Sequence, residues 1–487
     1  MKKALCLITA ILLLSSCQSG GETAVTDAVI ATEVQTDAPA ETTLLDALPT
    51  DLDYNGYEFH VLVIDKLVTN YGAIINGEEE NGETLNDASV KVNRFVEERY
   101  NVDLIYDLQS SSTSFSITSA VSKSAMAGDD AYQYAQFGSA WDNCVSLITD
   151  GSLYNILDLP GIDLNTPGFY TDANAEFIIN DQLYFAFSNY ANTGCLPIYM
   201  VFNINMLKEL DLELPYDTIF DGGWTMEVLE QYIKGVSSDL NGDGKIDGYD
   251  RHGLASGDLI SNYLVFGADI RVAERNENGS YVPAIQNTAF VNAAQKFLDF
   301  KHNNPDVFIH VDTNGGTNME HMFLLGNTLF AHTGSGLSNE NMRAITDFDF
   351  GIAPLPKFDA SQKDYGNYLF LNQFGIPSSI QNPEIVSQVI MGLAAASKVI
   401  MEPATLDVYV ETKLLRDDES VQVLQMMQND PLIDITRYFD FANGDITPVY
   451  LLSSAKDANN IMSNLEKKAT AAEKKAEKFF SIFFEEG

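Results

Sequence analysis

Basic residues, histidine and tryptophan are scarce in this chain of 487 residues. Its 28 lysines and arginines stand against 69 aspartates and glutamates, which gives a formal net charge of −41. A surface of this sign repels phosphate backbones and anionic headgroups, so we expect no nucleic-acid partner. Six histidines without an H-E-x-x-H motif argue against a catalytic zinc ion. We interpret the acidic excess as a solubilising coat.

Cysteine is also scarce, with four residues in the whole chain. Cys6 and Cys17 belong to the N-terminal region, which leaves Cys144 and Cys195 in the body. Two cysteines in a chain of this length make no disulfide framework, although an exported protein can pair them. We favour two buried thiols over a disulfide, because cysteine is often an ordinary core residue.

Motifs typical of enzymes are missing as well. The sequence has no G-x-S-x-G elbow, no G-x-x-x-x-G-K-[ST] loop and no G-x-G-x-x-G after a strand. Carboxylates are too numerous for a glycosidase pair to stand out, and sequence separation does not give the spacing between them. We therefore expect neither catalytic residues nor a catalytic cofactor.

Long apolar runs are absent too, and the N-terminal one is short. After Lys2 and Lys3, residues 4–14 are apolar or small except Thr9, and Ser15 and Ser16 follow. A run of 11 residues is too short to cross ~30 Å of hydrocarbon, and its flanks predict a secretory signal over 1–16. Residues 17–49 are rich in Thr, Ala, Glu and Asp, which predicts a disordered linker.

The rest of the chain alternates between strand and helix patterns. Period-two and 3.6-residue patterns predict, in order, a strand at 57–64, a helix at 85–100, a strand at 102–106, a helix at 115–127 and strands at 132–137 and 197–202. Further helices are expected after Thr225, over 290–298, from Pro383 and along the last 30 or so residues. This alternation predicts an α/β protein with mostly parallel sheets.

Five scattered segments carry a family resemblance. They are residues 98–102 (ERYNV), 201–210 (VFNINMLKEL), 224–225 (WT), 322–334 and 350–356 (FGIAPLP). In this order they resemble the extracellular solute-binding proteins of bacterial ABC importers, in particular maltose- and oligosaccharide-binding lipoproteins. Asp211 departs from the family's usual glycine. The residues Leu14-Ser15-Ser16-Cys17 are similar to a bacterial lipobox, which implies cleavage before Cys17 and lipid on its sulfur.

The resemblance implies a two-lobed periplasmic-binding-protein type II fold, with a hinge and a cleft between the lobes. Lobe 1 would contain 50–195 and a segment after 372. Lobe 2 would contain 196–371 and much of the C-terminus, with the hinge return and C-terminal helices within 372–487. The implied protein is monomeric and lipid-anchored to the outer face of the bacterial cell membrane. It would hand a small solute, most readily a sugar, to membrane permease subunits.

Positions relative to the family suggest ligand-binding residues: Trp141, Asp142, Tyr190, Asn192, Tyr199, His332 and Ser335. Trp141 and Asp142 follow the third predicted strand, at the carboxyl end where open α/β sheets bind ligands. The next three lie at or just before the first expected hinge crossing. Packing in the core or at the hinge is the alternative for each aromatic residue.

Residues 239–250 form the most distinct local motif. Oxygen-bearing side chains at loop positions 1, 3, 5, 9 and 12 are Asp239, Asn241, Asp243, Asp247 and Asp250, with Lys245 offering its carbonyl at position 7. This is the layout of an EF-hand calcium loop. Position 12 is aspartate rather than glutamate and no clear exiting helix follows. A structural calcium site and a solvated acidic turn both remain open.

Two other functions are compatible with an exported α/β protein. One is a secreted carbohydrate-active hydrolase, and the other is a calcium-dependent surface scaffold that uses the 239–250 loop. A single loop, rather than a duplicated pair, argues against the scaffold. Turnover of a bound sugar would distinguish the hydrolase from a binding protein.

Overall fold

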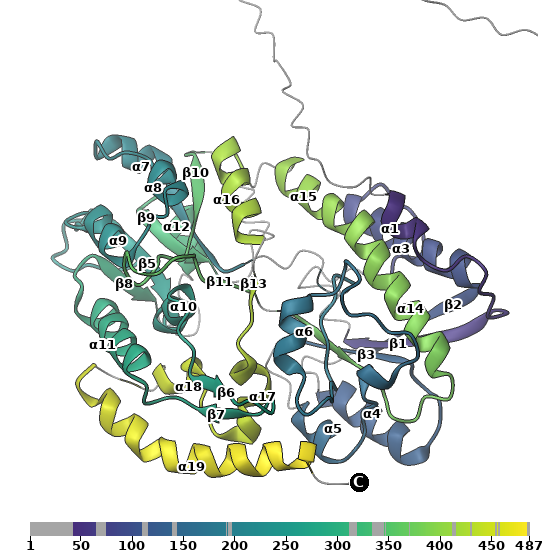
Figure 1. The fold of residues 1–487 in the computed structure, drawn as a ribbon. Helices are drawn as coiled ribbons and strands as arrows, with labels where there is room; N and C mark the ends of the chain where they lie inside the picture. The colour runs from purple at the N-terminus through teal and green to yellow at the C-terminus, as the bar shows by residue number, and fades with distance from the viewer. Residues whose placement is uncertain are drawn as a thin grey trace, which may run out of the picture. The chain divides into compact units, whose positions relative to one another are not determined.

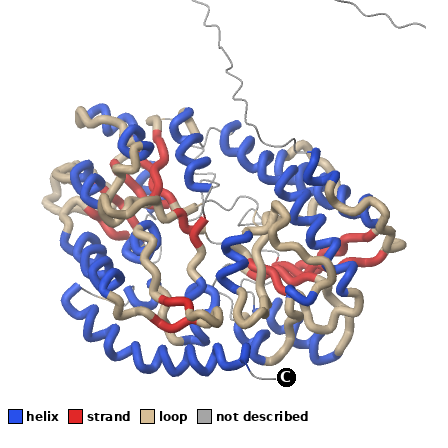
Figure 2. The backbone as a smooth tube through the Cα atoms, in the orientation of Figure 1, coloured by secondary structure: helices blue, strands red, loops and turns tan. Residues whose placement is uncertain are grey.

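The computed structural model describes residues 42–64, 75–109, 115–138, 144–190, 192, 197–310, 319–333, 345, 347–369, 371–411, 415–428, 431–452, 455 and 458–484. Two larger sheets, each flanked by helices, organise these residues (Figures 1 and 2). The predicted signal, the linker as far as residue 41, Cys17 and Cys195 lie outside the described residues.

The first sheet has the strand order β12-β3-β1-β2. Its strands are β1 (Tyr57–Ile64), β2 (Val102–Gln109), β3 (Tyr134–Phe137) and β12 (Gln373–Gly375). The helical segments of this part are α1 (Thr42–Asp46), α3 (Thr84–Tyr100), α4 (Phe115–Ala127), α5 (Val145–Thr149), η1 (Ile156–Asp158), α6 (Thr171–Phe177), α14 (Pro383–Ala396), η2 (Ser397–Met401) and α15 (Glu402–Glu411). The strand and helix patterns predicted for residues 57–137 are confirmed within a few residues at their ends.

The second sheet has the order β10-β4-β9-β5-β8. Its strands are β4 (Tyr199–Asn203), β5 (His252–Gly257), β8 (Val307–His310), β9 (Thr328–Thr333) and β10 (Phe350–Pro354). The helices in this half of the chain are α7 (Ile204–Glu209), α8 (Tyr216–Phe220), α9 (Met226–Ile233), α10 (Ile260–Gly267), α11 (Thr288–Asn303), α12 (Met319–Leu324) and α16 (Asp418–Gln428).

Two short strand pairs and a C-terminal set of helices complete the described fold. The pairs are β6 (Ala273–Arg275) with β7 (Tyr281–Pro283), and β11 (Asn367–Tyr368) with β13 (Pro431–Leu432). The C-terminal helical segments are α17 (Ile435–Asn443), α18 (Pro448–Leu452), η3 (Ala458–Asn460), α19 (Ile461–Ser481) and η4 (Ile482–Phe484). The apolar face of α19, including Phe479 and Phe480, is buried, as expected for a helix docked on the body.

Strand direction differs in part from the prediction. Pairs β1–β2, β1–β3, β5–β8 and β5–β9 are parallel, but β4 is antiparallel to both its neighbours and β12 is antiparallel to β3. Parallel neighbours need a crossover connection, which usually supplies a helix. Strands β4 and β12 instead follow the points where the chain passes from one half of the fold to the other. Their direction therefore does not follow from the alternation of strands and helices in the sequence.

Local signals explain several helix starts. The side-chain oxygen of Thr225 accepts a hydrogen bond from the Val228 amide at 3.4 Å, which caps α9 as predicted. Pro383 begins α14 directly after Asn382. Among the described residues, one helical run, Pro383–Asp407, is long and apolar enough to span a membrane, and 67% of its most apolar window is buried inside the protein. It packs on α3, and we interpret it as a core helix.

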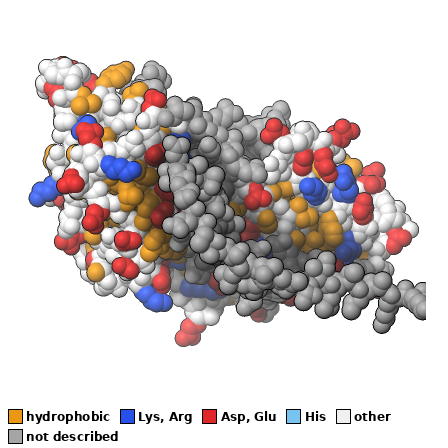
Figure 3. All heavy atoms as spheres, turned by 90° about the horizontal axis from the view of Figure 1, so that it is seen from above, with side chains coloured by type: hydrophobic (Ala, Val, Ile, Leu, Met, Phe, Trp, Pro, Cys, Tyr) orange, Lys and Arg blue, Asp and Glu red, His pale blue; other side chains and the backbone are white. Residues whose placement is uncertain are grey.

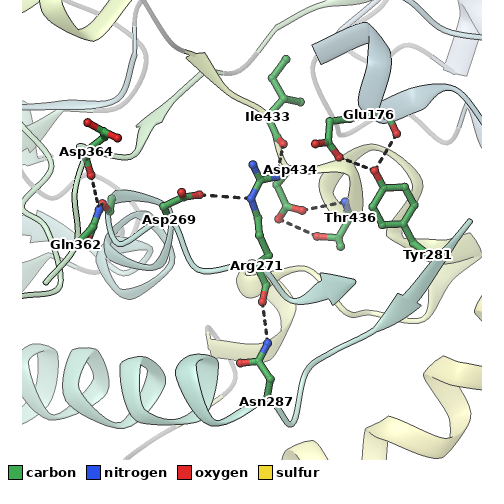
Figure 4. Close-up of polar contacts among 11 residues, drawn as sticks. Glu176, Asp269, Arg271, Tyr281, Asn287, Gln362, Asp364, Ile433, Asp434 and Thr436 are labelled. Carbon is green, nitrogen blue, oxygen red and sulfur yellow. Dashed lines mark hydrogen bonds and ion pairs between the residues drawn. The ribbon is translucent and has the colours of Figure 1, made fainter. Parts of the chain in front are cut away.

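The β6–β7 hairpin touches the end of α6, far away in sequence. The Tyr281 hydroxyl lies 2.5 Å from Glu176 Oε2 and 3.0 Å from the Glu176 carbonyl oxygen (Figure 4). Arg275 donates to the Ile178 carbonyl at 2.9 Å. The Phe483 carbonyl, just beyond α19, accepts from Asn180 at 2.6 Å. These contacts join the halves of the fold outside the segments that connect them covalently.

Candidate ligand-binding site

The chain segments that connect the two halves are held together by Asn192. Its Oδ1 accepts a hydrogen bond from the Asn372 amide at 2.6 Å, and its Nδ2 donates to the Asn372 carbonyl at 2.9 Å and to the Ser188 carbonyl at 2.8 Å. The Ile198 amide donates to the Tyr368 carbonyl at 2.9 Å. Asn192 and Asn372 are both 5% exposed. Asn192 therefore acts as a buried polar link between two connecting segments.

The carboxyl ends of β5 and β9 lie next to each other in the second sheet. Ala255 pairs with Ala331 in a parallel register, so Ser256 and His332 follow side by side with their side chains on one sheet face. The helix α10 begins three residues after β5 ends and carries Tyr263. The Tyr263 ring stacks on the His332 ring with centroids 4.3 Å apart and planes at 22°. Open α/β sheets bind ligands at this edge.

His332 is neutral in this environment. Its side chain is buried, and burial lowers the pKa of His332 to about 3 because the imidazolium form would lose its hydration. Its Nε2 has no hydrogen-bond partner among the described residues, and neither has the Oγ of Ser256, which is fully buried. Buried polar atoms are normally paired, so these two atoms require an explanation.

Charged side chains of the C-terminal segment lie close to the same edge. The charge of Arg437 on α17 opposes the upward shift that burial imposes on the pKa of Tyr263 and of Tyr368. Tyr368 stacks on Phe266 of α10 with ring centroids 3.9 Å apart. The positive charge of Arg437 also interacts with the buried Asp434 carboxyl and opposes the upward shift that burial imposes on its pKa.

Hydrogen bonds fix the segment around Asp434. The Thr436 amide and hydroxyl donate to Asp434 at 3.0 and 2.8 Å, and Arg271 donates to the adjacent Ile433 carbonyl at 2.9 Å (Figure 4). Burial raises the pKa of Asp434 above its ordinary value. The peptide preceding α17 is thereby attached to the segment between α10 and β6.

The structure distributes the sequence-predicted ligand residues unevenly. His332 lies at the carboxyl edge of the second sheet, and Tyr199 begins β4, where it pairs with Thr333 of β9. Tyr190 is 2% exposed, and its hydroxyl lies 2.6 Å from that of Tyr106, which places it in the core of the first half. Trp141, Asp142 and Ser335 lie outside the described residues. Ligand contact by each of the seven stays a prediction.

Tyr263 and Ser256 were missed by reasoning from the sequence. Ser256 lies just before the carboxyl end of the parallel strand β5, and Tyr263 lies in the helix that follows it. The rule that selected Trp141 and Asp142 in the first half concerns this edge of a sheet. In the sequence, residues 251–254 indicate a turn into a strand, so applying that rule a second time would have found Ser256. The stacking of Tyr263 on His332 depends on tertiary structure and has no local sequence signal.

The 239–250 loop has turns of the kind found in calcium loops. Asp239 accepts from the Gly242 and Gly244 amides at 2.6 and 2.8 Å, and Asn241 accepts from the Asp243 amide at 2.8 Å. Asp250 is fully buried, and hydrogen bonds from the Asp247 and Leu240 amides lower its pKa. Within the described ranges, no group of three His, Cys, Asp or Glu side chains converges as metal ligands would. A calcium ion here stays a prediction.

Surface and thiol predictions can be followed in part. Acidic side chains are spread over the visible face and interspersed with basic ones, as in a solubilising coat (Figure 3). Cys144 is 1% exposed. Because Cys195 is not described, the choice between thiols and a disulfide stays a prediction.

Comparison with solved structures defines the fold. M. tuberculosis UspC matches with a TM-score of 0.56 and 14% identity, over 86% of this chain and 100% of that one. An ABC substrate-binding protein from Listeria monocytogenes in complex with cycloalternan matches with a TM-score of 0.52 and 11% identity, over 88% and 99%. The maltose-binding protein MalE from Listeria monocytogenes, in complex with maltose, matches at 0.51 and 15%, over 88% and 97%.

These neighbours place the chain in the two-lobed α/β fold of periplasmic solute-binding proteins, as the resemblance implied. The cycloalternan complex is described as an ABC substrate-binding protein, and the maltose complex is described as a periplasmic maltose-binding protein. Neither is described as an enzyme. No protein-family model and no curated protein matches the sequence. We call the half with the first sheet lobe 1 and the half with the second sheet lobe 2.

Proposed function

We propose that this protein is the substrate-binding lipoprotein of an ABC importer and captures a sugar or oligosaccharide between its lobes. The observation that carries the proposal is the fold match with UspC, the cycloalternan complex and MalE, which spans 86–88% of this chain and 97–100% of each neighbour. A match of that extent leaves little of either chain to form a different architecture.

The physical logic of two lobes suits capture and delivery. Closure around a ligand excludes water, and a ligand that contacts both lobes stabilises the closed state by its difference in affinity for the two states. A permease can then distinguish the loaded protein from the empty one. The protein itself needs no catalytic residue for this role, and we propose that it is not an enzyme.

The proposed location follows from the N-terminal sequence. Cleavage before Cys17 and lipid on its sulfur would tether the monomeric protein to the outer face of the cell membrane, with the residues between Cys17 and helix α1 (Thr42–Asp46) as a spacer. Replacing residues 1–17 with a secretory signal that lacks the lipobox cysteine should move the protein from the membrane fraction to the soluble fraction. Retention of this variant in the membrane fraction would contradict lipid anchoring.

Ligand capture is tested with the same soluble variant, whose signal lacks the lipobox cysteine. We expect a thermal-shift screen of maltose, maltodextrins, cycloalternan and unrelated oligosaccharides to find at least one sugar that raises the melting temperature. Isothermal titration calorimetry then gives the affinity, and chromatography of the sugar after incubation shows whether it is unchanged. Turnover would favour a hydrolase, and failure of every sugar to bind would contradict the proposal.

A further inference from the structure

We propose that Ser256 and His332, beside the Tyr263 ring, form a ligand subsite on lobe 2 that takes an uncharged hydroxyl-bearing group. This inference rests on the proposed function and assigns part of its site. The subsite lies at the carboxyl ends of β5 and β9, where the register places Ser256 and His332 on adjacent strands and on one face of the sheet.

The first argument is the unpaired polar atoms. Ser256 is 0% exposed and His332 2% exposed, yet Ser256 Oγ and His332 Nε2 have no hydrogen-bond partner among the described residues. An unpaired buried polar atom is unfavourable, because it has lost its hydrogen bonds to water and gained none in the protein. Two such atoms on neighbouring residues of one sheet edge indicate a partner that the protein chain does not itself provide. A ligand hydroxyl can satisfy both, because it donates one hydrogen bond and accepts others.

The second argument is the Tyr263 ring. It is half-buried, and its stack on His332 at 4.3 Å holds the imidazole plane in place. Aromatic rings with a few placed polar groups are typical linings of small-molecule sites. The pair therefore combines a fixed polar atom with an apolar surface, which suits a molecule that has both hydroxyl groups and C–H faces.

The third argument is charge, which sets the class of ligand group. His332 stays neutral, because burial lowers the pKa of His332 to about 3. Lys301 on α11 forms an ion pair at 2.6 Å with Asp258, the residue that directly follows β5. The positive charge of Arg437 has the Asp434 carboxyl as a partner of opposite sign within the protein. A carboxylate, phosphate or ammonium group would lose its hydration at this subsite without gaining a charged partner from Ser256 or His332.

The experiment begins with two panels of ligands on the soluble protein that is made with a signal lacking the lipobox cysteine. One panel contains neutral mono- and oligosaccharides, including maltose and cycloalternan, and the other contains uronates and sugar phosphates. We expect the tightest ligand to be neutral. If only anionic sugars bind, the subsite is wrong while the proposed function stands. If nothing in either panel binds, the proposed function fails and this inference fails with it.

Two matched serine variants then test the subsite with the tightest neutral sugar. Ser256→Ala should weaken binding about threefold to tenfold, the fold-change of one lost hydrogen bond, while the melting temperature is unchanged or higher. Ser261→Ala is the control, because Ser261 is buried and its hydroxyl donates to the Phe297 carbonyl at 3.4 Å. It should lower the melting temperature and leave the affinity unchanged. Unchanged affinity in Ser256→Ala overturns the proposal.

Variants of the stacked pair provide an independent measurement. His332→Phe keeps a planar ring against Tyr263 but removes both nitrogens, and we expect it to weaken binding at least threefold. Tyr263→Ala should weaken binding more than Tyr263→Phe, which keeps the ring. Circular dichroism and melting temperature verify that each variant is folded. Wild-type affinity in the folded His332→Phe and Tyr263→Ala variants would show that the ligand does not reach this edge.

Discussion

The link that Asn192 makes between two connecting segments predicts a large and specific loss of stability. Substituting Asn192→Ala removes at least three hydrogen bonds, two with the Asn372 backbone and one with the Ser188 carbonyl. Because these backbone groups are buried, they cannot all be rehydrated. A typical hydrogen bond contributes about 0.5–1.5 kcal/mol and an unpaired buried group costs about 1–3 kcal/mol. We expect the free energy of unfolding to fall by about 2–4 kcal/mol.

The assay is urea unfolding followed by circular dichroism, with the change in stability obtained from the midpoint and the slope. The matched control is Asn189→Ala, because the side-chain Nδ2 of Asn189 donates to Glu402 Oε2 at 2.5 Å in an exposed contact. Exposed contacts of this kind contribute about 0–1 kcal/mol. A destabilisation by Asn192→Ala no larger than that of Asn189→Ala would refute the reasoning.

A second substitution tests the same link by the chemistry of its donor. In the wild type, Asn192 Nδ2 donates to the Asn372 and Ser188 carbonyls. Asn192→Asp keeps an acceptor for the Asn372 amide but replaces this donor with an oxygen that faces the two carbonyls. At pH 7 we expect it to destabilise the protein at least as much as Asn192→Ala. Protonation of the new carboxyl restores one donor, so the difference from the wild type should shrink as the pH falls toward 4. A pH-independent difference would contradict this account of the link.

Three further predictions follow from other parts of the fold. If the 239–250 loop holds calcium, a chelator should lower the melting temperature by several degrees, and Asp239→Ala should lose that response; an unchanged melting temperature would exclude a structural calcium ion. Burial raises the pKa of Asp440 to about 6, above its unfolded value, so its contribution to stability is present below the unfolded pKa and is lost as the pH rises through 6. Asp440→Asn keeps an acceptor for the Ile446 amide but cannot ionise. As the pH rises from 5 to 7.5, the free energy of unfolding of Asp440→Asn, measured in urea, should increase relative to that of the wild type by on the order of 1 kcal/mol. Parallel pH profiles of the two proteins would contradict this prediction. The buried Trp224 donates to the Pro354 carbonyl at 2.9 Å, so Trp224→Phe should cost about 1–3 kcal/mol and leave Trp141 as the remaining tryptophan; a sugar that binds this variant without changing its emission would place Trp141 away from the ligand.

The sequence predicted those parts of the fold that local periodicity determines. Strand β1 and helix α3 have strong period-two and 3.6-residue patterns, and the starts of α9 and α14 have clear N-terminal signals in Thr225 and Pro383. The directions of β4 and β12 were not predicted, because they depend on partners far away in sequence. The β6–β7 hairpin was also missed, since its three-residue strands are too short for a periodic pattern.

The candidate site was predicted less well than the fold. His332 was selected by its position relative to the family-like segment 322–334, and it does lie at a carboxyl edge. Asn192 was selected as a ligand residue, but the three described hydrogen bonds of its side chain are all to backbone groups of the protein. Tyr190 makes its hydroxyl contact with Tyr106, a partner 84 residues away in sequence. Sequence distance conceals such partners, so a polar residue near a hinge cannot be assigned to the ligand or to the protein from its position alone.

The seating of β12 against β3 has a consequence for how the chain acquires its structure. Gln373 pairs with Phe137, and α14 packs on α3 through Gly392, where an added Cβ would lie 2.7 Å from the Tyr100 ring. Lobe 1 therefore cannot complete its sheet and helix packing until β12 and α14 have been synthesised, more than 200 residues after β3. Until then the open edge of β3 is available for wrong pairing, and contacts between such distant residues slow folding. During synthesis the sheet of lobe 2, which is complete once residue 354 has emerged, can form before the sheet of lobe 1.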